Sequence, residues 1–159
     1  MMDKEDTKIV AYLRENARIK LTQLARKTGM PVSTLFDRVH DLPGLGIVRL
    51  SALLDFSAIG FSTRATILMK AGKDRRDALR EHLLKAQCVN TLARINNGYD
   101  FMAECVFRDL RELEEFCEKL EQAYGAKQRE VHFVIEELKR ESFLADPALL
   151  EALGGKQDA

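Results

Sequence analysis

The residues best suited to chemistry in this chain are cations within its first 40 positions. Six basic residues lie between positions 14 and 38, where only Glu15 and Asp37 oppose them. These cations are Arg14, Arg18, Lys20, Arg26, Lys27 and Arg38. Residues 1–50 carry nine Lys and Arg against six Asp and Glu, although the whole chain has a net charge of zero. Such a local excess of positive charge is typical of a surface that binds a polyanion, and also of an ordinary solvated face.

A helix-turn-helix motif would position these cations. We expect one helix over residues 3–15, and a second, short helix that the Thr22 hydroxyl caps and Gly29 ends. The turn TGMP at residues 28–31 precedes a third helix, which Ser33 is placed to cap. Two short helices joined by a tight, glycine-bearing turn are the pattern of a DNA-binding helix-turn-helix.

The third helix is the one expected to enter the major groove of double-stranded DNA. Its apolar residues Leu35, Val39 and Leu42 recur at spacings of four and three, so they form one buried stripe. The opposite face and the nearby cations are then available to base edges and phosphates. The predicted DNA-contacting residues are Lys20, Arg26, Lys27, Pro31, Ser33, Thr34, Phe36 and Arg38.

Side-chain chemistry suggests a role for several of these residues. Ser33 and Thr34 can contact a phosphate or a base edge, and Phe36 can meet a thymine methyl group. Arg38 suits phosphate or guanine. A purely structural interpretation stays open, in which Ser33 only caps the helix and Arg38 pairs with a neighbouring aspartate.

A wing is expected to follow the third helix. Residues 43–46 hold one proline and two glycines, which end the helix. Residues 47–50 and 52–54 then predict two short strands or one bent strand. The sequence therefore predicts a winged helix-turn-helix domain over residues 1–54 and a linker over 55–60.

Beyond residue 60 the apolar pattern alternates between periods of two and 3.6 residues. Strands are expected over 61–69, 89–95, 99–107 and 130–138, and helices over 78–86 and 110–124. The order β, α, β, β, α, β predicts a ferredoxin-like domain over residues 61–141, in which helices cover one face of an antiparallel sheet. The fold class of the whole chain is therefore α+β. A C-terminal tail over 142–159 is expected to hold one short helix, between Asp146-Pro147 and Gly154-Gly155.

The sheet face that the helices leave bare is expected to be covered by another subunit. It carries the apolar residues Leu68, Met102 and Val106, interrupted by Arg64 and Glu104. An apolar face of this size is unfavourable in water. The sequence therefore predicts a homodimer, or a higher homo-oligomer, formed through the C-terminal domain.

Segments along nearly the whole chain, from Asp3 to about Lys139, resemble the Lrp/AsnC family, the feast/famine regulators. In the N-terminal half they are DTKIVAYLREN at residues 6–16, Leu24-Ala25, Ser33-Thr34 through Arg38-Val39, Gly46-Ile47-Val48 and Leu54-Asp55 to Gly60-Phe61. In the C-terminal half they are Gly98-Tyr99-Asp100, Asp109 with Leu113, Gly125 and Glu137-Leu138-Lys139. The resemblance implies a C-terminal RAM-type domain that dimerises, further assembly into larger oligomers, and amino acids or related metabolites as effectors.

The turn Asn97-Gly98-Tyr99-Asp100 is the expected effector site. Gly98 lets the backbone approach a ligand closely, and the Asp100 carboxylate can receive a cationic amino group. A capping or hairpin role would explain Asp100 equally well. Arg129 and Val131 stand where family members often carry threonine or serine, which indicates either an effector other than a simple aliphatic amino acid or a pocket that has lost its ligand.

Catalysis, metal binding and cofactor binding find little support in the sequence. The histidines His40, His82 and His132 are scattered over three predicted elements, and no phosphate-binding glycine loop is present. The three cysteines have no CxxC spacing and lie in apolar patterns, as buried structural thiols do. We therefore expect no enzyme activity, no catalytic residue, no metal site and no cofactor.

Two other functions stay open. Haem-pathway decarboxylases share this two-domain architecture, but they carry clustered histidine, arginine and tryptophan residues, and this chain has no tryptophan. The chain could also act as an oligomerisation partner of related regulators without binding DNA tightly. The absence of an apolar run of about 20 residues and the acidic start, MMDKED, predict a cytoplasmic protein without a membrane anchor.

Overall fold

Apolar side chains form two separate cores in the computed structural model. The described residues are 3–41, 43–47 and 49–148. One core belongs to a unit that holds the chain up to Ala52 together with the residues from Leu138 onward. The other core belongs to a unit that spans Leu53–Glu137.

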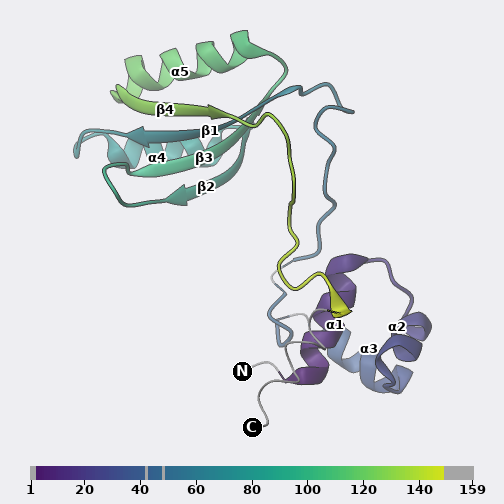
Figure 1. Ribbon diagram of the computed structural model, residues 1–159. Coiled ribbons are helices and arrows are strands. Elements are labelled where there is room, and N and C mark those ends of the chain that lie inside the picture. The colour runs from purple at the N-terminus through teal and green to yellow at the C-terminus, as the bar shows by residue number, and fades with distance from the viewer. Residues whose placement is uncertain (1–2, 42, 48, 149–159) are drawn as a thin grey trace. The chain divides into compact units, whose positions relative to one another are not determined.

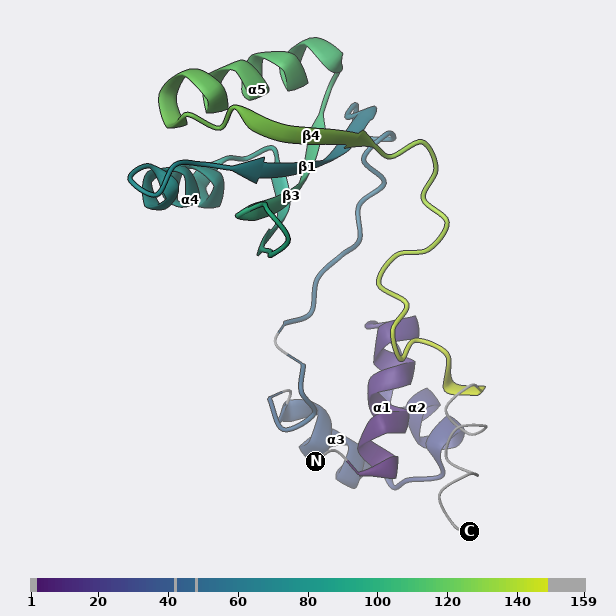
Figure 2. The same ribbon diagram turned by 60° about the vertical axis from the view of Figure 1, so that its left-hand side comes forward.

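Three helices build the first unit, as Figure 2 shows: α1 (Lys4–Glu15), α2 (Leu21–Thr28) and α3 (Val32–His40). Ile9, Leu24 and Leu35 contribute one completely buried side chain from each helix. Asp3 caps α1 by accepting a hydrogen bond of 2.6 Å from the α1 backbone. Gly29 ends α2 in the left-handed conformation, with φ at 76°. The three helices predicted from the sequence are confirmed.

The two side-chain caps predicted for α2 and α3 are wrong. Thr22 lies inside α2, because the Lys20 carbonyl already accepts the first hydrogen bonds of that helix, at 2.9 Å. Ser33 lies inside α3, which follows Pro31 and has no side-chain cap. Proline suits this position because its φ is fixed close to the helical value and it has no N–H to leave unpaired.

The described part of the predicted wing contains no strand; Val48 lies outside it. Only Ser51 separates the two predicted strands, whereas a hairpin turn needs about two residues between its strands. Leu50 and Leu53 are 51% and 61% exposed, so no core holds this segment in a sheet.

The C-terminal segment 138–148 belongs to the same unit as α1. The Arg14 guanidinium donates to the Glu141 carbonyl oxygen at 2.7 Å and lies 3.2 Å from the Glu141 carboxylate. A helical turn begins near the end of the segment, where the Ala148 N–H donates to Asp146 Oδ1 at 3.0 Å. The rest of the predicted tail helix lies outside the described residues.

The second unit is an antiparallel sheet with two helices. Its elements are β1 (Thr63–Lys70), α4 (Arg76–Lys85), β2 (Val89–Arg94), β3 (Phe101–Phe107), α5 (Leu110–Tyr124) and β4 (Gln128–Phe133). Figure 1 shows the strand order β2-β3-β1-β4, with β1 and β3 in the middle. The predicted β, α, β, β, α, β order and antiparallel pairing are confirmed.

Both helices pack on one face of the sheet. Along β1, alternate side chains are completely buried, as a strand with one covered face requires. These side chains, Ala65, Ile67 and Met69, share a core with Leu79 and Leu83 of α4 and Leu113, Cys117 and Leu120 of α5. No helix of the described part of the chain packs on the opposite face of the sheet.

Strand β4 is shorter than predicted. It ends at Phe133, which pairs with Ala65, and the chain makes one more backbone bond, from the Val134 N–H to the Arg64 carbonyl. Beyond this point the chain leaves the sheet, although Thr63 of β1 extends one residue further. Ile135, inside the strand predicted over residues 130–138, lies two residues beyond the end of β4 and is 98% exposed.

His82 lies between the two helices of this unit. Its ring stacks on Tyr124 at 4.7 Å and on Phe116 at 6.2 Å between centroids. Nε2 is buried and has no hydrogen-bond partner among the described atoms. Burial, with a smaller effect from the Lys119 charge, lowers the pKa of His82. The folded protein therefore favours the neutral imidazole.

We expect acid to destabilise the second unit through His82. The unfolded chain takes up the proton near pH 6.5 and the folded chain only at a lower pH. The stabilising effect of neutral His82 is present above pH 6.5 and is lost as pH falls through the folded pKa. His82→Leu should flatten the fall in unfolding free energy between pH 7.5 and 5.5, measured by urea denaturation. His132→Gln, at an exposed histidine, is the control; an unchanged slope in His82→Leu would contradict this account.

Candidate DNA interface and ligand site

Helix α3 turns one stripe of side chains toward solvent. Ser33, Phe36, Asp37 and His40 are exposed, and their spacings of three, one and three place them on one side of the helix. Leu35 lies on the other side and is completely buried. The sequence prediction missed His40, which is the last residue of the helix.

The predicted DNA-contacting residues of this region fall into two groups. Ser33 and Phe36 lie in the exposed stripe, and Pro31 is exposed directly before the helix. Thr34 and Arg38 lie four residues apart on the flank, where both are half-buried. The first group faces solvent directly, whereas the second is partly covered by the rest of the unit.

Arg38 binds three carboxylates at the start of α1. Its guanidinium lies 3.2 Å from Asp3, 3.1 Å from Glu5 and 2.5 Å from Asp6. The Asp6 backbone N–H, together with the Arg38 charge, lowers the pKa of the Asp3 carboxyl. The hydrogen bond to Asp6 in turn raises the pKa of Arg38. These bonds link α3 to the start of α1. The carboxylates lie 32 to 35 residues before Arg38 in the sequence.

The remaining predicted cations lie on or beside α2. Lys20, Arg26 and Lys27 are all exposed. Neither α2 nor α3 has a side-chain cap or an acidic residue in its first turn. The partial positive charge at each helix start is therefore left for an outside anion, and phosphate oxygens are well suited to that place.

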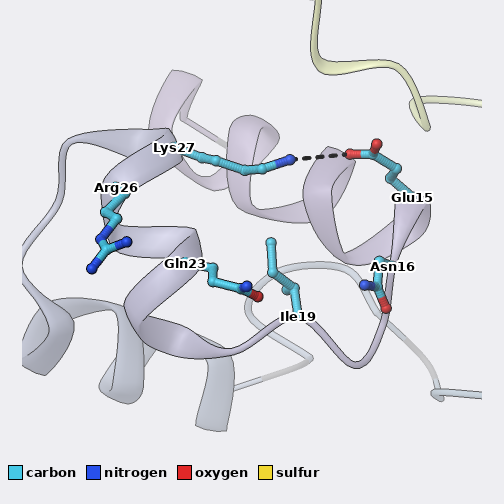
Figure 3. Close-up of a pocket in the computed structure, with 6 residues that line it drawn as sticks. All are labelled: Glu15, Asn16, Ile19, Gln23, Arg26 and Lys27. Carbon is cyan, nitrogen blue, oxygen red and sulfur yellow. Dashed lines mark ion pairs between the residues drawn. The ribbon is translucent and has the colours of Figure 1, made fainter.

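An open pocket of about 380 Å³ lies between the end of α1 and α2. Its lining residues are Glu15, Asn16, Ile19, Gln23, Arg26 and Lys27, drawn in Figure 3. Lys27 reaches across to Glu15, with 3.9 Å between Nζ and Oε2, and also lies over the Tyr12 ring. Arg26 extends away from that pair and forms no salt bridge with another described residue.

The predicted effector turn joins β2 to β3. Asn97 and Gly98 both adopt positive φ, at 62° and 94°, and the space beside Gly98 is open. The Tyr99 hydroxyl donates to the Glu130 carboxylate on β4, and this bond lowers the pKa of Glu130. The hairpin signal in the sequence is thus confirmed, and the turn is tied to the far edge strand.

Asp100 is already engaged within the fold. Its Oδ2 accepts from the Ala71 N–H at 3.1 Å, and its Oδ1 lies 2.8 Å from Arg76 Nε, without the alignment of a hydrogen bond. The Asp100 N–H donates to the Met69 carbonyl at 2.8 Å. The side chain is 12% exposed. Asp100 therefore links the hairpin to the β1–α4 loop, and the sequence prediction identified neither Arg76 nor Ala71 as its partners.

The two positions that depart from the family pattern both lie on β4. Arg129 is partly buried and forms an ion pair of 2.8 Å with Glu121 of α5, which raises the pKa of Arg129. Val131 packs against the core. The side chain of Arg129 is thus held by α5.

The bare sheet face is mixed in character. Leu68 and Met102 pair across β1 and β3 and are half-buried, and Val106 is buried. Beside them the Arg64 guanidinium contacts Glu104 at 2.6 Å. Burial alone would raise the pKa of Glu104, but hydrogen bonds, above all from Arg64, lower it. The face therefore combines an apolar patch with the Arg64–Glu104 ion pair.

Other kinds of site find no support in the described part of the chain. No three His, Cys, Asp or Glu side chains within it are grouped as a metal ion would require. Cys105 and Cys117 are buried free thiols, and burial raises the pKa of Cys117. No helix among residues 3–41, 43–47 and 49–148 is long and apolar enough to cross a bilayer.

Comparison with family models matches both units. The AsnC-type helix-turn-helix domain matches residues 2–42, and the Lrp/AsnC ligand binding domain matches residues 64–144. An uncharacterized HTH-type transcriptional regulator from Pyrococcus furiosus is 30% identical over 132 residues, 82% of this chain and 89% of the relative. One from Pyrococcus horikoshii is 30% identical over 145 residues, 87% of this chain and 94% of the relative.

Solved structures show the same fold. A transcriptional regulator from Neisseria meningitidis, in complex with L-Met, superposes with a TM-score of 0.81 at 24% identity, over 88% of this chain and 94% of the other. AsnC of E. coli superposes with a TM-score of 0.79 at 17% identity, over 91% and 99%. LrpC of B. subtilis gives 0.78 at 18%, over 87% and 98%.

Proposed function

Because the chain belongs to the Lrp/AsnC family of transcriptional regulators, we propose that it binds specific duplex DNA as a homo-oligomer and responds to an amino acid or related metabolite. The observation that carries the DNA-binding part is the exposed stripe of α3, next to two uncapped helix starts. Helix starts and cations hold the phosphates, while the stripe meets base edges.

Among the cations, Arg26 is the strongest candidate for a phosphate contact. It is exposed on α2, whereas Arg38 would have to exchange its carboxylate partners for a phosphate. Lys20 stands at the start of α2, where the helix dipole adds to its charge. Lys27 contributes from the same helix while paired with Glu15.

The DNA-binding proposal is tested by salt dependence. Affinity of the full chain for a selected duplex should fall steeply between 50 and 200 mM salt, because bound phosphates release counterions. Arg26→Ala should lower the slope of log affinity against log salt by about one. Arg111→Ala, at an exposed cation on α5, removes the same charge and should leave the slope unchanged. Fluorescence anisotropy measures all three, and salt-independent binding would refute the proposal.

The oligomer is proposed to form through the bare sheet face. Leu68 and Met102, beside the buried Val106, leave apolar surface that a second copy of the domain can cover. In a two-fold dimer, the same face of each subunit covers that of the other. The charges of Arg64 and Glu104 pair with each other within one chain. Burying this face in a dimer therefore leaves neither charge without a partner.

A charge placed on this face should separate the subunits. We expect Leu68→Asp to convert the full chain to a monomer at micromolar concentration in sedimentation velocity, because a buried carboxylate would have no partner. Leu84→Asp makes the same change at an exposed leucine of α4 and should leave the oligomer intact. Circular dichroism checks that both variants fold. A folded Leu68→Asp that still sediments as an oligomer would place the interface elsewhere.

The effector is proposed to bind at the turn of residues 97–100. The open space beside Gly98 admits a small ligand, and the Asp100 carboxylate offers an acceptor for an ammonium group. The structural neighbour from N. meningitidis was solved with L-Met, which makes amino acids the first compounds to test. Asp100 would then share its charge between the ligand and Arg76.

Two variants distinguish a ligand contact from a structural role of Asp100. Asp100→Ala should abolish binding of the effector and lower the unfolding free energy by about 1 to 3 kcal/mol, since the Ala71 N–H loses its acceptor. Arg76→Ala removes a competitor for the carboxylate and should preserve or strengthen binding. Calorimetric titration of the wild type with the twenty amino acids identifies the ligand. Undiminished binding by Asp100→Ala would exclude this site.

A further inference from the structure

The exposed stripe of α3 lacks a basic side chain other than His40. Ser33, Phe36 and Asp37 make up the rest of it, and Arg38 lies on the flank, bound to the carboxylates of α1. Arginine paired with guanine is the commonest base-specific contact in the major groove. The side chains that this helix presents therefore have to read other base edges.

Phe36 is placed for an apolar contact outside the protein. Its side chain is 48% exposed, and it does not belong to the core of the helical unit. The ring packs against His40, with 4.2 Å between ring centroids and an interplanar angle of 32°. This contact restricts the orientation of the Phe36 ring. The apolar group that the major groove offers to such a ring is the methyl group of thymine.

Asp37 places a carboxylate on a surface that is to approach a polyanion. No ion pair or hydrogen bond involves this carboxylate within the described residues. Repulsion by phosphates makes it unfavourable unless it meets a hydrogen-bond donor on the DNA. The major-groove donor with which aspartate pairs is the N4 amino group of cytosine.

We infer that α3 recognises thymine and cytosine in neighbouring base pairs. The Phe36 ring contacts the thymine methyl group, and Asp37 accepts a hydrogen bond from cytosine N4. His40 is a positioning residue that holds the Phe36 ring. This inference rests on the proposed function, in which α3 enters the major groove.

Selection from a random duplex library with the full-length protein identifies the preferred site. Replacing the contacted thymine by uracil removes only the methyl group and should weaken wild-type binding about fourfold, the value of one buried methyl group. Phe36→Ala should bind thymine and uracil sites equally. His40→Ala should reduce the thymine preference, and His40→Phe, which keeps a ring beside Phe36, should restore it.

Asp37→Asn should act on affinity and specificity in opposite directions. Removing the negative charge should strengthen binding to unrelated DNA, while the preference for cytosine falls about tenfold and shifts toward adenine, which asparagine recognises. A change that merely damaged the fold would weaken all binding. If the wild type binds no duplex, the proposed function fails and the inference fails with it. If it binds but the variants select the same site with the same methyl preference, only the inference is overturned.

Discussion

The rotation of α3 about its own axis decides which side chains this chain can present to DNA, and the Arg38–Asp6 ion pair fixes that rotation. The guanidinium draws one flank of α3 against the start of α1, while Leu35 anchors the inner side. With both contacts in place, the outer side holds an aromatic pair and one carboxylate. The arginine nearest to the exposed stripe thus holds α3 against α1, and an aromatic pair and a carboxylate are left on the outer side.

Asp100 plays a comparable part in the second unit. Its carboxylate accepts a hydrogen bond from the Ala71 N–H in the β1–α4 loop and lies beside Arg76, the first residue of α4, so it links the hairpin to both segments. A ligand whose ammonium group approached Asp100 would compete with Arg76 for the same charge. We therefore expect the binding of such a ligand to be coupled to the position of Arg76 through this one side chain.

The helices themselves were largely predictable from the sequence, because they depend on nearby residues. The burial of Leu35 follows from local periodicity, and the helix end at Gly29 follows from the preference of glycine for positive φ. Both are properties of short segments. The end of β4 and the missing wing strands were not predictable, because a strand exists only where a partner pairs with it. Phe133 is the last residue of β4 because the residues after it, beyond the Val134 N–H, do not pair with β1.

In the candidate sites, too, the features set by adjacent residues were predictable and the contacts between distant residues were not. The turn around Gly98 is encoded by adjacent residues, and the structure shows the positive φ that they favour. The carboxylate partners of Arg38 and the arginine partner of Asp100 lie tens of residues away, beyond the reach of periodicity. The sequence prediction missed His40 for another reason. Its proposed role is to pack against the Phe36 ring and not to contact DNA itself.

The bond between Arg14 and Glu141 makes the helical unit discontinuous in sequence, because its segments come from both ends of the chain. A gene fragment that stops after Ala52 would omit a segment that belongs to this unit. An affinity tag fused to the C-terminal segment would be attached to the helical unit. Expression vectors and reporter fusions for this protein are therefore best designed with the second unit as an insertion between two pieces of the first.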